Sequence, residues 1–267
     1  MKDDNLISTE NLTGGYGKSA VIRDVSFDIK KGDFLGIIGP NGSGKSTLLK
    51  LMSRVLTPQS GRVTLDKTDI RHMGLKGLSQ KIAFVPQETL INFSFSVEEI
   101  VLMGRIPHLK RLQHETKNDH AIVQRSLQET DTVNLKDKYI NELSAGERQR
   151  AIIARALAQE PAILFLDEPT SHLDIGHQIQ MLNLLKKLNR ERSLTVLIVL
   201  HDLNLASEYC DRLILLEKGR IFKVGAPHEV LTYQNIEKVY KTIVVVNENP
   251  ISKKPYVLLV SGERKTE

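Results

Sequence analysis

The chain has 267 residues, of which 40% are hydrophobic and 26% are charged, enough apolar material for one or two globular domains. Its net charge of +5 suits an anionic ligand, but the basic residues are scattered and only 5% of residues are aromatic, which argues against a nucleic-acid partner. A single cysteine, Cys210, excludes an internal disulfide and disfavours a cysteine-based metal site, so we expect it to be a small packed side chain.

The sequence also indicates where the protein works. No apolar run reaches the roughly 18 to 20 residues that are needed to cross a bilayer. The first ten residues, MKDDNLISTE, lack the basic and apolar regions of a signal peptide. We therefore expect a protein that stays in the cytoplasm.

Buried strands alternate with helices along the chain. Four short apolar runs bounded by Gly, Pro or Asp are typical of parallel strands that are covered on both faces: 33–39, 81–86, 162–169 and 194–202. A helical pattern between the last two runs repeats apolar residues every three to four positions: Ile175, Ile179, Leu182, Leu185 and Leu188. This alternation predicts an α/β protein.

Three segments depart from that alternation. Residues 89–155 carry mostly polar helical sequence, so we expect a helical subdomain inserted into an α/β core that is formed by 1–88 and 156–242. Residues 212–225 predict a β-hairpin that turns at Lys218-Gly219. The remaining residues, 243–267, are expected to form a C-terminal extension with a short pair of strands.

A phosphate-binding loop is the strongest single motif. The residues between the first apolar run and the next helix fit the pattern G-x-x-x-x-G-K-[ST]: Gly39, Pro40, Asn41, Gly42, Ser43, Gly44, Lys45 and Ser46. Glycines let backbone N–H groups turn toward phosphate oxygens, and the helix N-terminus adds partial positive charge. We expect Lys45 to reach the outer phosphates, Ser46 to ligate magnesium, and Thr47 to lie in the same nucleotide site.

Two carboxylates end the third apolar run. Hydrolysis of a nucleotide needs a carboxylate for the metal and a group that orients water, and Asp167 and Glu168 supply these in that order. Taken alone, carboxylates after a strand are as readily helix caps or solvated turn residues. Together with the phosphate loop they favour a site that hydrolyses ATP with Mg²⁺.

The segment Leu143-Ser144-Ala145-Gly146-Glu147 resembles the LSGGQ signature of the nucleotide-binding subunits of ATP-binding cassette (ABC) transporters. In that family two subunits pair head to tail, so the resemblance implies that Ser144, Ala145, Gly146 and Glu147 cover the partner's ATP. Alanine replaces the first glycine and glutamate replaces glutamine, which leaves their effect on the rate open. The S-x-x-E spacing also predicts a capping box in which Glu147 turns back on its own helix.

Other positions match further motifs of the family, over about residues 5 to 240. By resemblance, Tyr16 stacks on adenine, Gln87 contacts magnesium, Asp174 communicates across the dimer, and His201 hydrogen-bonds the terminal phosphate. Taken alone, Tyr16, Gln87 and His201 would more often be packed or solvated side chains. The resemblance implies a P-loop NTPase core that is RecA-like with a mainly parallel sheet, an antiparallel β subdomain and the inserted helical subdomain.

Residues 101–109 and 167–178 resemble the branch of the family that imports ferric siderophores, haem and cobalamin. The resemblance implies a peripheral ATPase subunit on the cytoplasmic face of the membrane, with a second copy of itself, a polytopic permease docked on the helical subdomain, and indirectly a solute-binding protein. Alternatives are an importer or exporter of another substrate, a soluble ABC ATPase that acts on DNA ends or ribosomes, and a module that binds ATP without hydrolysis. The absence of a long coiled coil disfavours the soluble ATPase, and the presence of Glu168 and His201 disfavours the binding module.

Overall fold

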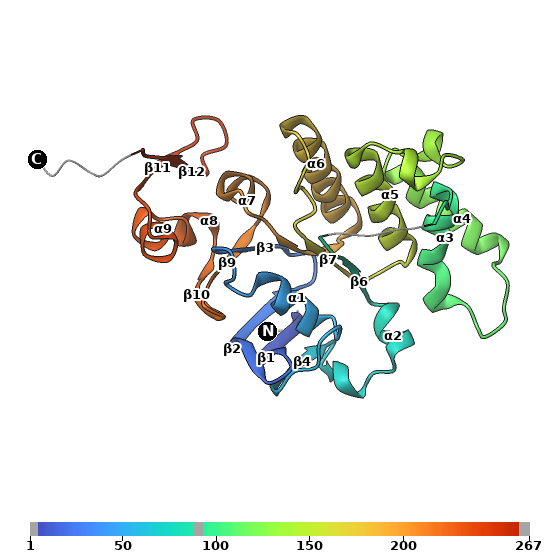
Figure 1. The fold of residues 1–267 in the computed structure, drawn as a ribbon, viewed down its shortest axis with the longest axis horizontal. Coiled ribbons are helices and arrows are strands. Elements are labelled where there is room, and N and C mark those ends of the chain that lie inside the picture. The colour runs from blue at the N-terminus through green and yellow to red at the C-terminus, as the bar shows by residue number, and fades with distance from the viewer. Residues whose placement is uncertain (1–4, 88–92, 262–267) are drawn as a thin grey trace, which may run out of the picture. The chain divides into compact units, whose positions relative to one another are not determined.

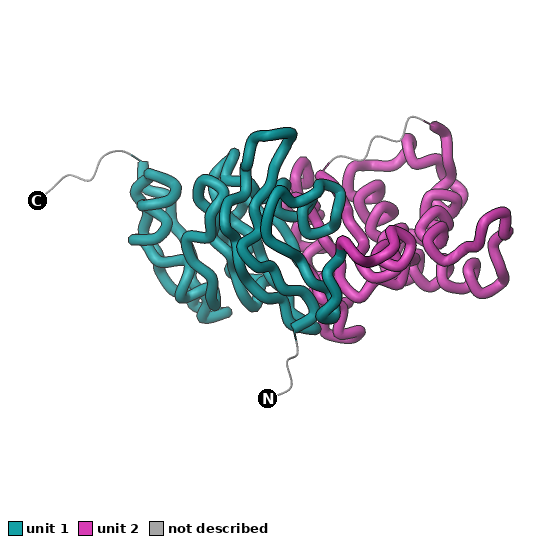
Figure 2. The backbone as a smooth tube through the Cα atoms, turned by 90° about the horizontal axis from the view of Figure 1, so that it is seen from below, with its two compact units in different colours: residues 1–70, 197–267 teal, residues 71–196 magenta. Residues whose placement is uncertain are grey.

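The computed structural model describes residues 5–87 and 93–261. The chain divides into two compact units, Met1–Ile70 with Leu197–Glu267 and Arg71–Val196, which Figure 2 shows in two colours. Each unit contains part of the α/β architecture and has buried apolar side chains of its own. Among the described residues, no helix is both long enough and apolar enough to span a membrane.

Unit 1 contains an antiparallel sheet at its N-terminal end. Its strand order is β2-β1-β4-β5, with bounds β1 Asn5–Tyr16, β2 Ser19–Lys30, β4 Ser60–Leu65 and β5 Thr68–Asp69. Polar and apolar residues alternate along the second half of β2, so that Val25, Phe27 and Ile29 are buried on one face. This sheet corresponds to the antiparallel β part of the expected fold.

A second sheet of unit 1 carries the phosphate loop. β3 (Phe34–Ile38) pairs parallel with β9 (Arg212–Glu217), which in turn pairs antiparallel with β10 (Arg220–Gly225). On its other side β3 lies next to β8 (Thr195–Val199), whose last three residues belong to this unit. Every residue of β3 is buried, as a strand covered on both faces requires. Cys210 is also buried, and its Sγ would lie 2.6 Å from a Cβ added at Gly36, so it is the packed side chain that we expected.

The helices of unit 1 follow its strands. They are α1 (Lys45–Met52), α7 (Leu203–Tyr209), α8 (Pro227–Val230) and α9 (Tyr233–Tyr240). The described chain then ends in an antiparallel pair, β11 (Val244–Glu248) and β12 (Pro255–Leu259), and β12 packs against α7. Figure 1 shows this pair beside α9, at the red end of the colour scale.

Unit 2 contains the other two expected strands. β6 (Ile82–Val85) and β7 (Ile163–Asp167) pair parallel, with Ile82 opposite Ile163, and all residues of β7 are buried. The short elements η1 (Ile70–His72) and α2 (Leu75–Ser79) precede β6, and the long helix α6 (Ile175–Arg192) follows β7.

Helices form the rest of unit 2. They are α3 (Val97–Leu102), η2 (Met103–His108), α4 (Lys117–Glu129), η3 (Val133–Leu135), η4 (Ile140–Glu142) and α5 (Ala145–Ala158). α5 packs against both α3 and α4, as the green part of Figure 1 shows. A Cβ at Gly104 would lie 2.2 Å from the carbonyl oxygen of Arg155, so the close approach of η2 to α5 requires glycine there.

The predicted strands, the α/β class and the 212–225 hairpin are confirmed. The hairpin turns at Lys218 and Gly219 with φ angles of 48° and 79°, the positive values of a two-residue β-turn. The helix predicted from the apolar repeat at 175–188 is confirmed as α6, although its apolar face is not buried along its whole length. Ile175 and Ile179 are 75% and 40% exposed, whereas the later residues of the same apolar stripe are buried. The repeat identifies one face of α6, but it does not report that neighbouring elements leave the first turns of that face uncovered.

Candidate functional site

The phosphate loop connects β3 to α1 in unit 1 and depends on its glycines. Gly39, Gly42 and Gly44 have φ angles of 149°, 76° and 103°, all in the region that favours glycine. A Cβ at Gly39 would lie 2.4 Å from the carbonyl oxygen of Leu216, and one at Gly44 would lie 2.7 Å from Cδ1 of Ile22. The loop therefore holds a conformation that other residues would break at two of these points.

The polar atoms of the loop fit an anionic oxygen ligand. Lys45 is only 5% exposed, and its Nζ donates hydrogen bonds to the carbonyl oxygens of Gly39 at 2.9 Å and Pro40 at 3.2 Å. The Oγ of Ser43 is buried without a hydrogen-bond partner. Buried polar atoms are rarely left unpaired. The unpaired Ser43 hydroxyl, in the same loop as the Lys45 ammonium group, therefore indicates that a ligand atom completes the site. Ser46 and Thr47 follow in the first turn of α1, half-buried and buried.

Two further expected residues lie in unit 1. Tyr16 ends β1 with 51% exposure, and the Nζ of Lys50 lies 5.7 Å from its ring centroid and 3.2 Å from its hydroxyl. The Tyr16 ring is therefore exposed enough for a planar group to stack on it. His201 is exposed directly before the N-cap of α7, where the Asp202 carboxylate accepts hydrogen bonds from two backbone N–H groups of the helix.

The carboxylate pair lies at the end of β7 in unit 2. Asp167 is the last residue of the strand and is 3% exposed, and Glu168 is 8% exposed. The Nε2 of Gln87 donates a 2.6 Å hydrogen bond to Oε2 of Glu168, so the structure brings these two predicted residues together. Glu168 has a φ of 52°, a conformation that costs a non-glycine residue about 1 kcal/mol or more. Ser171 compensates through hydrogen bonds from its N–H and Oγ to the Glu168 carbonyl oxygen.

The signature-like segment begins α5. Ser144 is the N-cap, and its Oγ accepts a hydrogen bond from the Glu147 N–H at 3.3 Å. The Glu147 carboxylate accepts bonds from the N–H of Ser144 at 2.9 Å and from its Oγ at 2.7 Å. The predicted capping box is confirmed. These bonds, chiefly that from the Ser144 side chain, lower the pKa of Glu147.

His177 is a residue that sequence reasoning missed. The Asp174 carboxylate accepts a 2.9 Å bond from the His177 N–H and pairs with its Nδ1 at 2.8 Å, and these two bonds lower the pKa of Asp174. A Cβ at Gly146 would lie 2.7 Å from the His177 ring, so the ring lies directly against the signature glycine. His177 thus joins two segments that the sequence analysis treated separately. The Asp-x-x-His spacing at a helix start was the available signal.

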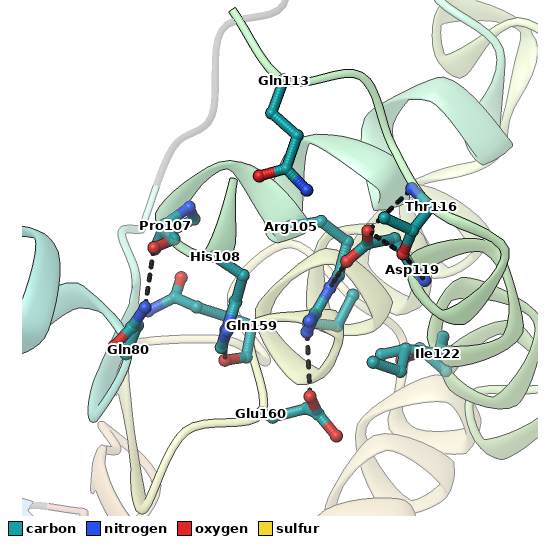
Figure 3. Close-up of polar contacts among 12 residues, drawn as sticks. Gln80, Arg105, Pro107, His108, Gln113, Thr116, Asp119, Ile122, Gln159 and Glu160 are labelled. Carbon is teal, nitrogen blue, oxygen red and sulfur yellow. Dashed lines mark hydrogen bonds and ion pairs between the residues drawn. The ribbon is translucent and has the colours of Figure 1, made fainter. Parts of the chain in front are cut away.

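Arg105 organises the segment 101–109, and Figure 3 shows its contacts. The side chain is 3% exposed, with Nε 2.9 Å from Asp119 Oδ1 and Nη1 3.0 Å from Glu160 Oε2. Nη1 also donates to the carbonyl oxygen of Ala158 at 2.6 Å. Hydrogen bonds from the side chain and then the backbone N–H of Thr116, followed by that from Arg105, lower the pKa of Asp119 to about 2 despite its burial.

The residues after Arg105 are held in the same way. The Pro107 carbonyl oxygen accepts a 2.8 Å bond from Gln80, and the His108 ring bonds the carbonyl oxygen of Gln159 at 2.9 Å (Figure 3). Ile106, which lies between Arg105 and Pro107 in sequence, is 62% exposed. The Ile106 side chain is therefore exposed, while polar contacts of its neighbours hold the backbone of the segment in place.

Comparison with known protein families identifies one domain. A family model described as ABC transporter matches residues 22–171. The chain is 43% identical over 249 residues to the ferric enterobactin transport ATP-binding protein FepC of Escherichia coli K12, covering 93% of this chain and 92% of that protein. It is 38% identical over 264 residues to the iron(3+)-hydroxamate import ATP-binding protein FhuC of Bacillus subtilis, covering 98% of each.

Solved structures agree with these similarities. A putative metal-chelate type ABC transporter in an inward-facing conformation has a chain with a TM-score of 0.84 and 30% identity, covering 96% of this chain and 98% of that one. A dimeric bacterial ABC transporter cassette has a TM-score of 0.72 and 32% identity, covering 82% of this chain and 98% of that one. The P-loop NTPase fold that the sequence predicts is therefore confirmed.

Proposed function

Because the chain belongs to the ABC transporter family and is an ATPase, we propose that it powers the import of a metal chelate through a membrane permease. The proposal rests on one observation, the near full-length similarity to the ATP-binding proteins for ferric enterobactin and iron(3+)-hydroxamate transport. A 40% identity over 230 residues to the cobalamin import protein BtuD of Halobacterium salinarum keeps cobalamin among the candidate cargoes. Ferric siderophores, haem and cobalamin are the chelates we propose to test.

In this proposal the loop of unit 1 binds ATP. Backbone N–H groups of residues 41–47 and the Lys45 ammonium group hold the phosphates, and the unpaired Ser43 hydroxyl gains a phosphate oxygen as its partner. The exposed ring of Tyr16 stacks on adenine. His201 donates a hydrogen bond to the terminal phosphate as negative charge redistributes in the transition state.

Residues of unit 2 supply the groups for hydrolysis. Glu168 accepts a hydrogen bond from the attacking water and orients it, while the bond from Gln87 holds the Glu168 carboxylate in place. The oxygen atoms of Asp167, Ser46 and Gln87 are the ligand type that Mg²⁺ prefers, and this ion would neutralise charge on the phosphate oxygens. The described residues contain no cluster of three or more His, Cys, Asp or Glu, so water and phosphate would complete the ligand set.

We propose that two copies of the chain pair head to tail. Ser144, Ala145, Gly146, Glu147 and Asp174 then cover the ATP of the partner. The position of Ser144 and Ala145 at the exposed N-terminus of a 14-residue helix supports this role, since such a terminus attracts phosphate. The Glu147 carboxylate, turned back on Ser144, keeps its negative charge away from that ligand.

The helical region of unit 2 is the proposed docking surface for the permease, which places the protein on the cytoplasmic face of the membrane. Ile106 supplies an exposed apolar contact, and the Arg105 contacts keep its backbone fixed. A rigid backbone lowers the entropy cost of docking.

The first test is isolation of the chain from its own membranes in mild detergent, with mass identification of what accompanies it. We expect a polytopic membrane protein, and ATPase activity of the complex that rises when a solute-binding protein loaded with ferric siderophore, haem or cobalamin is added. Recovery with DNA or ribosomes would contradict the transport proposal.

A second test concerns the paired site. Glu168→Gln keeps the side-chain volume but removes the carboxylate that orients water, so we expect it to bind ATP, hydrolyse at least about 100-fold more slowly, and sediment as a dimer with Mg-ATP. A variant that stays monomeric with saturating nucleotide would contradict the head-to-tail arrangement.

A further inference from the structure

The helix that follows His201 is bonded to the last strand of the described chain. The Asn204 side chain accepts a 2.7 Å bond from the N–H of Val257 and donates a 3.2 Å bond to its carbonyl oxygen. One amide group thus pairs with both backbone groups of a β12 residue, as a neighbouring strand would. One turn further along α7, the Ser207 Oγ donates a 2.7 Å bond to the Pro255 carbonyl oxygen. β12 therefore holds α7 at two successive turns.

This attachment lies close to His201 along the chain. Asp202 caps α7 by accepting bonds from the N–H groups of Asn204 at 2.7 Å and Leu205 at 2.9 Å. His201 precedes this cap directly, so a shift of the first turn of α7 moves its backbone. The Asn204 contact to β12 fixes that turn.

The same C-terminal segment also reaches the phosphate loop. Tyr240 ends α9, and its hydroxyl is buried without a hydrogen bond of normal geometry. Burial raises the pKa of this hydroxyl to about 12, and a weak interaction with the Gly39 backbone opposes that rise. Gly39 is the first glycine of the loop, and its carbonyl oxygen holds the Lys45 ammonium group.

Two cavities of unit 1 meet at Tyr240. One, of about 290 Å³, is lined by Tyr240, Lys241 and the loop residues Pro40 to Ser43. The other, of about 280 Å³, is lined by Tyr240 and Val257 together with His201, Asp202 and Asn204. A single C-terminal side chain thus borders both the phosphate loop and the space beside His201.

We propose that residues 233–259, which comprise α9, β11 and β12, position the phosphate loop and His201 relative to each other. Asn204 and Tyr240 are the positioning residues: Asn204 transmits the position of β12 to α7, and Tyr240 supports Gly39. This role rests on the function proposed for His201 at the terminal phosphate. The segment makes no contact with ATP itself in this proposal.

Asn204→Ala tests the contact to β12. A displacement of His201 by a fraction of an ångström weakens a bond that matters in the transition state, so kcat should fall about tenfold while KM for ATP stays within about twofold. Thr9→Ala is the matched control, because the Thr9 hydroxyl also both donates to and accepts from the backbone of one residue, Phe27, within unit 1. The control should lose comparable thermal stability and keep its kcat.

Tyr240→Phe tests the contact to the loop. It removes a buried hydroxyl that has no normal hydrogen bond, so the melting temperature should stay level or rise. KM for ATP should nevertheless rise severalfold, because the weak interaction of this hydroxyl with the Gly39 backbone is lost. A merely structural role for Tyr240 predicts an unchanged KM.

Asn204→Asp is the second variant for the contact to β12, and it replaces Asn204→Ala if that variant does not fold. It keeps the acceptor for the Val257 N–H but loses the donor, so it should show a smaller loss of kcat than Asn204→Ala.

His201→Ala separates this proposal from the function on which it rests. A wild-type rate in His201→Ala would overturn the role proposed for His201, and the positioning role with it. An inactive His201→Ala variant, combined with a kcat in Asn204→Ala equal to that of Thr9→Ala, would overturn the positioning role alone.

Discussion

Two helices of this protein, α1 and α5, begin at segments that the sequence predicts to bind phosphate. The backbone N–H groups of their first turns find partners in different ways. α1 begins after Gly44, which has a φ of 103° and provides no side-chain cap. α5 begins after Ser144, which forms a full capping box with Glu147. The α1 terminus leaves its N–H groups to the loop and to a ligand, whereas α5 satisfies part of its own terminus first.

This difference indicates that the α1 terminus can bind phosphate with groups of its own chain, whereas the α5 terminus cannot. The α1 terminus has an adjacent ammonium group and an orphaned hydroxyl, so it has the partners that an anion needs. The α5 terminus instead has the Glu147 carboxylate turned toward it, where it accepts bonds from the N–H and Oγ of Ser144. We infer that α5 contributes to a phosphate site only when another chain supplies the rest.

The largest expected effect comes from Gly44→Ala at the α1 terminus. A Cβ at this positive φ would be strained and would lie 2.7 Å from Ile22 Cδ1, so the loop or the Ile22 side chain must shift. We expect ATPase activity to fall at least about 100-fold, as when an electrostatic donor is lost, with a lower melting temperature. Gly77→Ala is the control, since a Cβ at Gly77 meets nothing within 4 Å. Activity near wild type in Gly44→Ala would contradict the strained-loop interpretation.

The next effect concerns the support of the α5 terminus. His177→Ala removes the ring that lies against Gly146 and the partner of Asp174. We expect hydrolysis at saturating ATP to fall about tenfold, with dimer formation at higher ATP concentration in sedimentation. The melting temperature should change little because the side chain is 44% exposed. His120→Ala on the exposed face of α4 should leave all three measurements unchanged.

A change away from both termini should affect stability instead of hydrolysis. Asp119→Asn leaves the buried Arg105 without one of its two carboxylate partners, so we expect the free energy of unfolding to fall by about 2 to 4 kcal/mol and the melting temperature to be roughly 10 °C lower. The folded pKa of Asp119, about 2, lies below its usual 3.8, so its contribution is present above about pH 4 and is lost as the pH falls toward 2. The difference in unfolding free energy between the wild type and Asp119→Asn should therefore become smaller as the pH falls from about 4 toward 2. A constant gap would show that the carboxylate charge is not the cause.

The smallest effect should come from restoring the family's signature. Ala145→Gly and Glu147→Gln together remove an exposed methyl group and one negative charge but keep an amide that can complete the capping box. We expect dimerisation at about two- to threefold lower ATP concentration, with little change in melting temperature. A weaker dimer would indicate that the charge of Glu147 helps the partner's site.

Much of the site was predictable because its motifs depend on local backbone chemistry. The glycine spacing of residues 39–46 predicts a loop that needs positive φ angles, and all three of its glycines have them. The S-x-x-E spacing at Ser144 predicts a cap, and the cap is present. Short apolar runs predict buried strands because only a covered strand is apolar on both faces.

What could not be predicted depends on residues far apart in sequence. The contact of His177 with Gly146 and the burial of Arg105 between Asp119 and Glu160 come from helix packing, which local spacing does not encode. The exposure of Ile175 has the same origin, since it depends on where neighbouring elements stop. The bonds between Asn204 and Val257 join positions that carry no common motif.

The bonds between Asn204 and Val257 also determine when α7 can be fixed during synthesis of the chain. Asn204 and Val257 are 53 residues apart, and synthesis proceeds at about 5 to 20 residues per second. For roughly 3 to 10 seconds a growing chain therefore contains all of α7 before the strand that holds it has been made. The helix behind His201 is thus among the last parts of the protein to be fixed, and a ribosome that stalls in this interval leaves a chain with its phosphate loop made and this support missing.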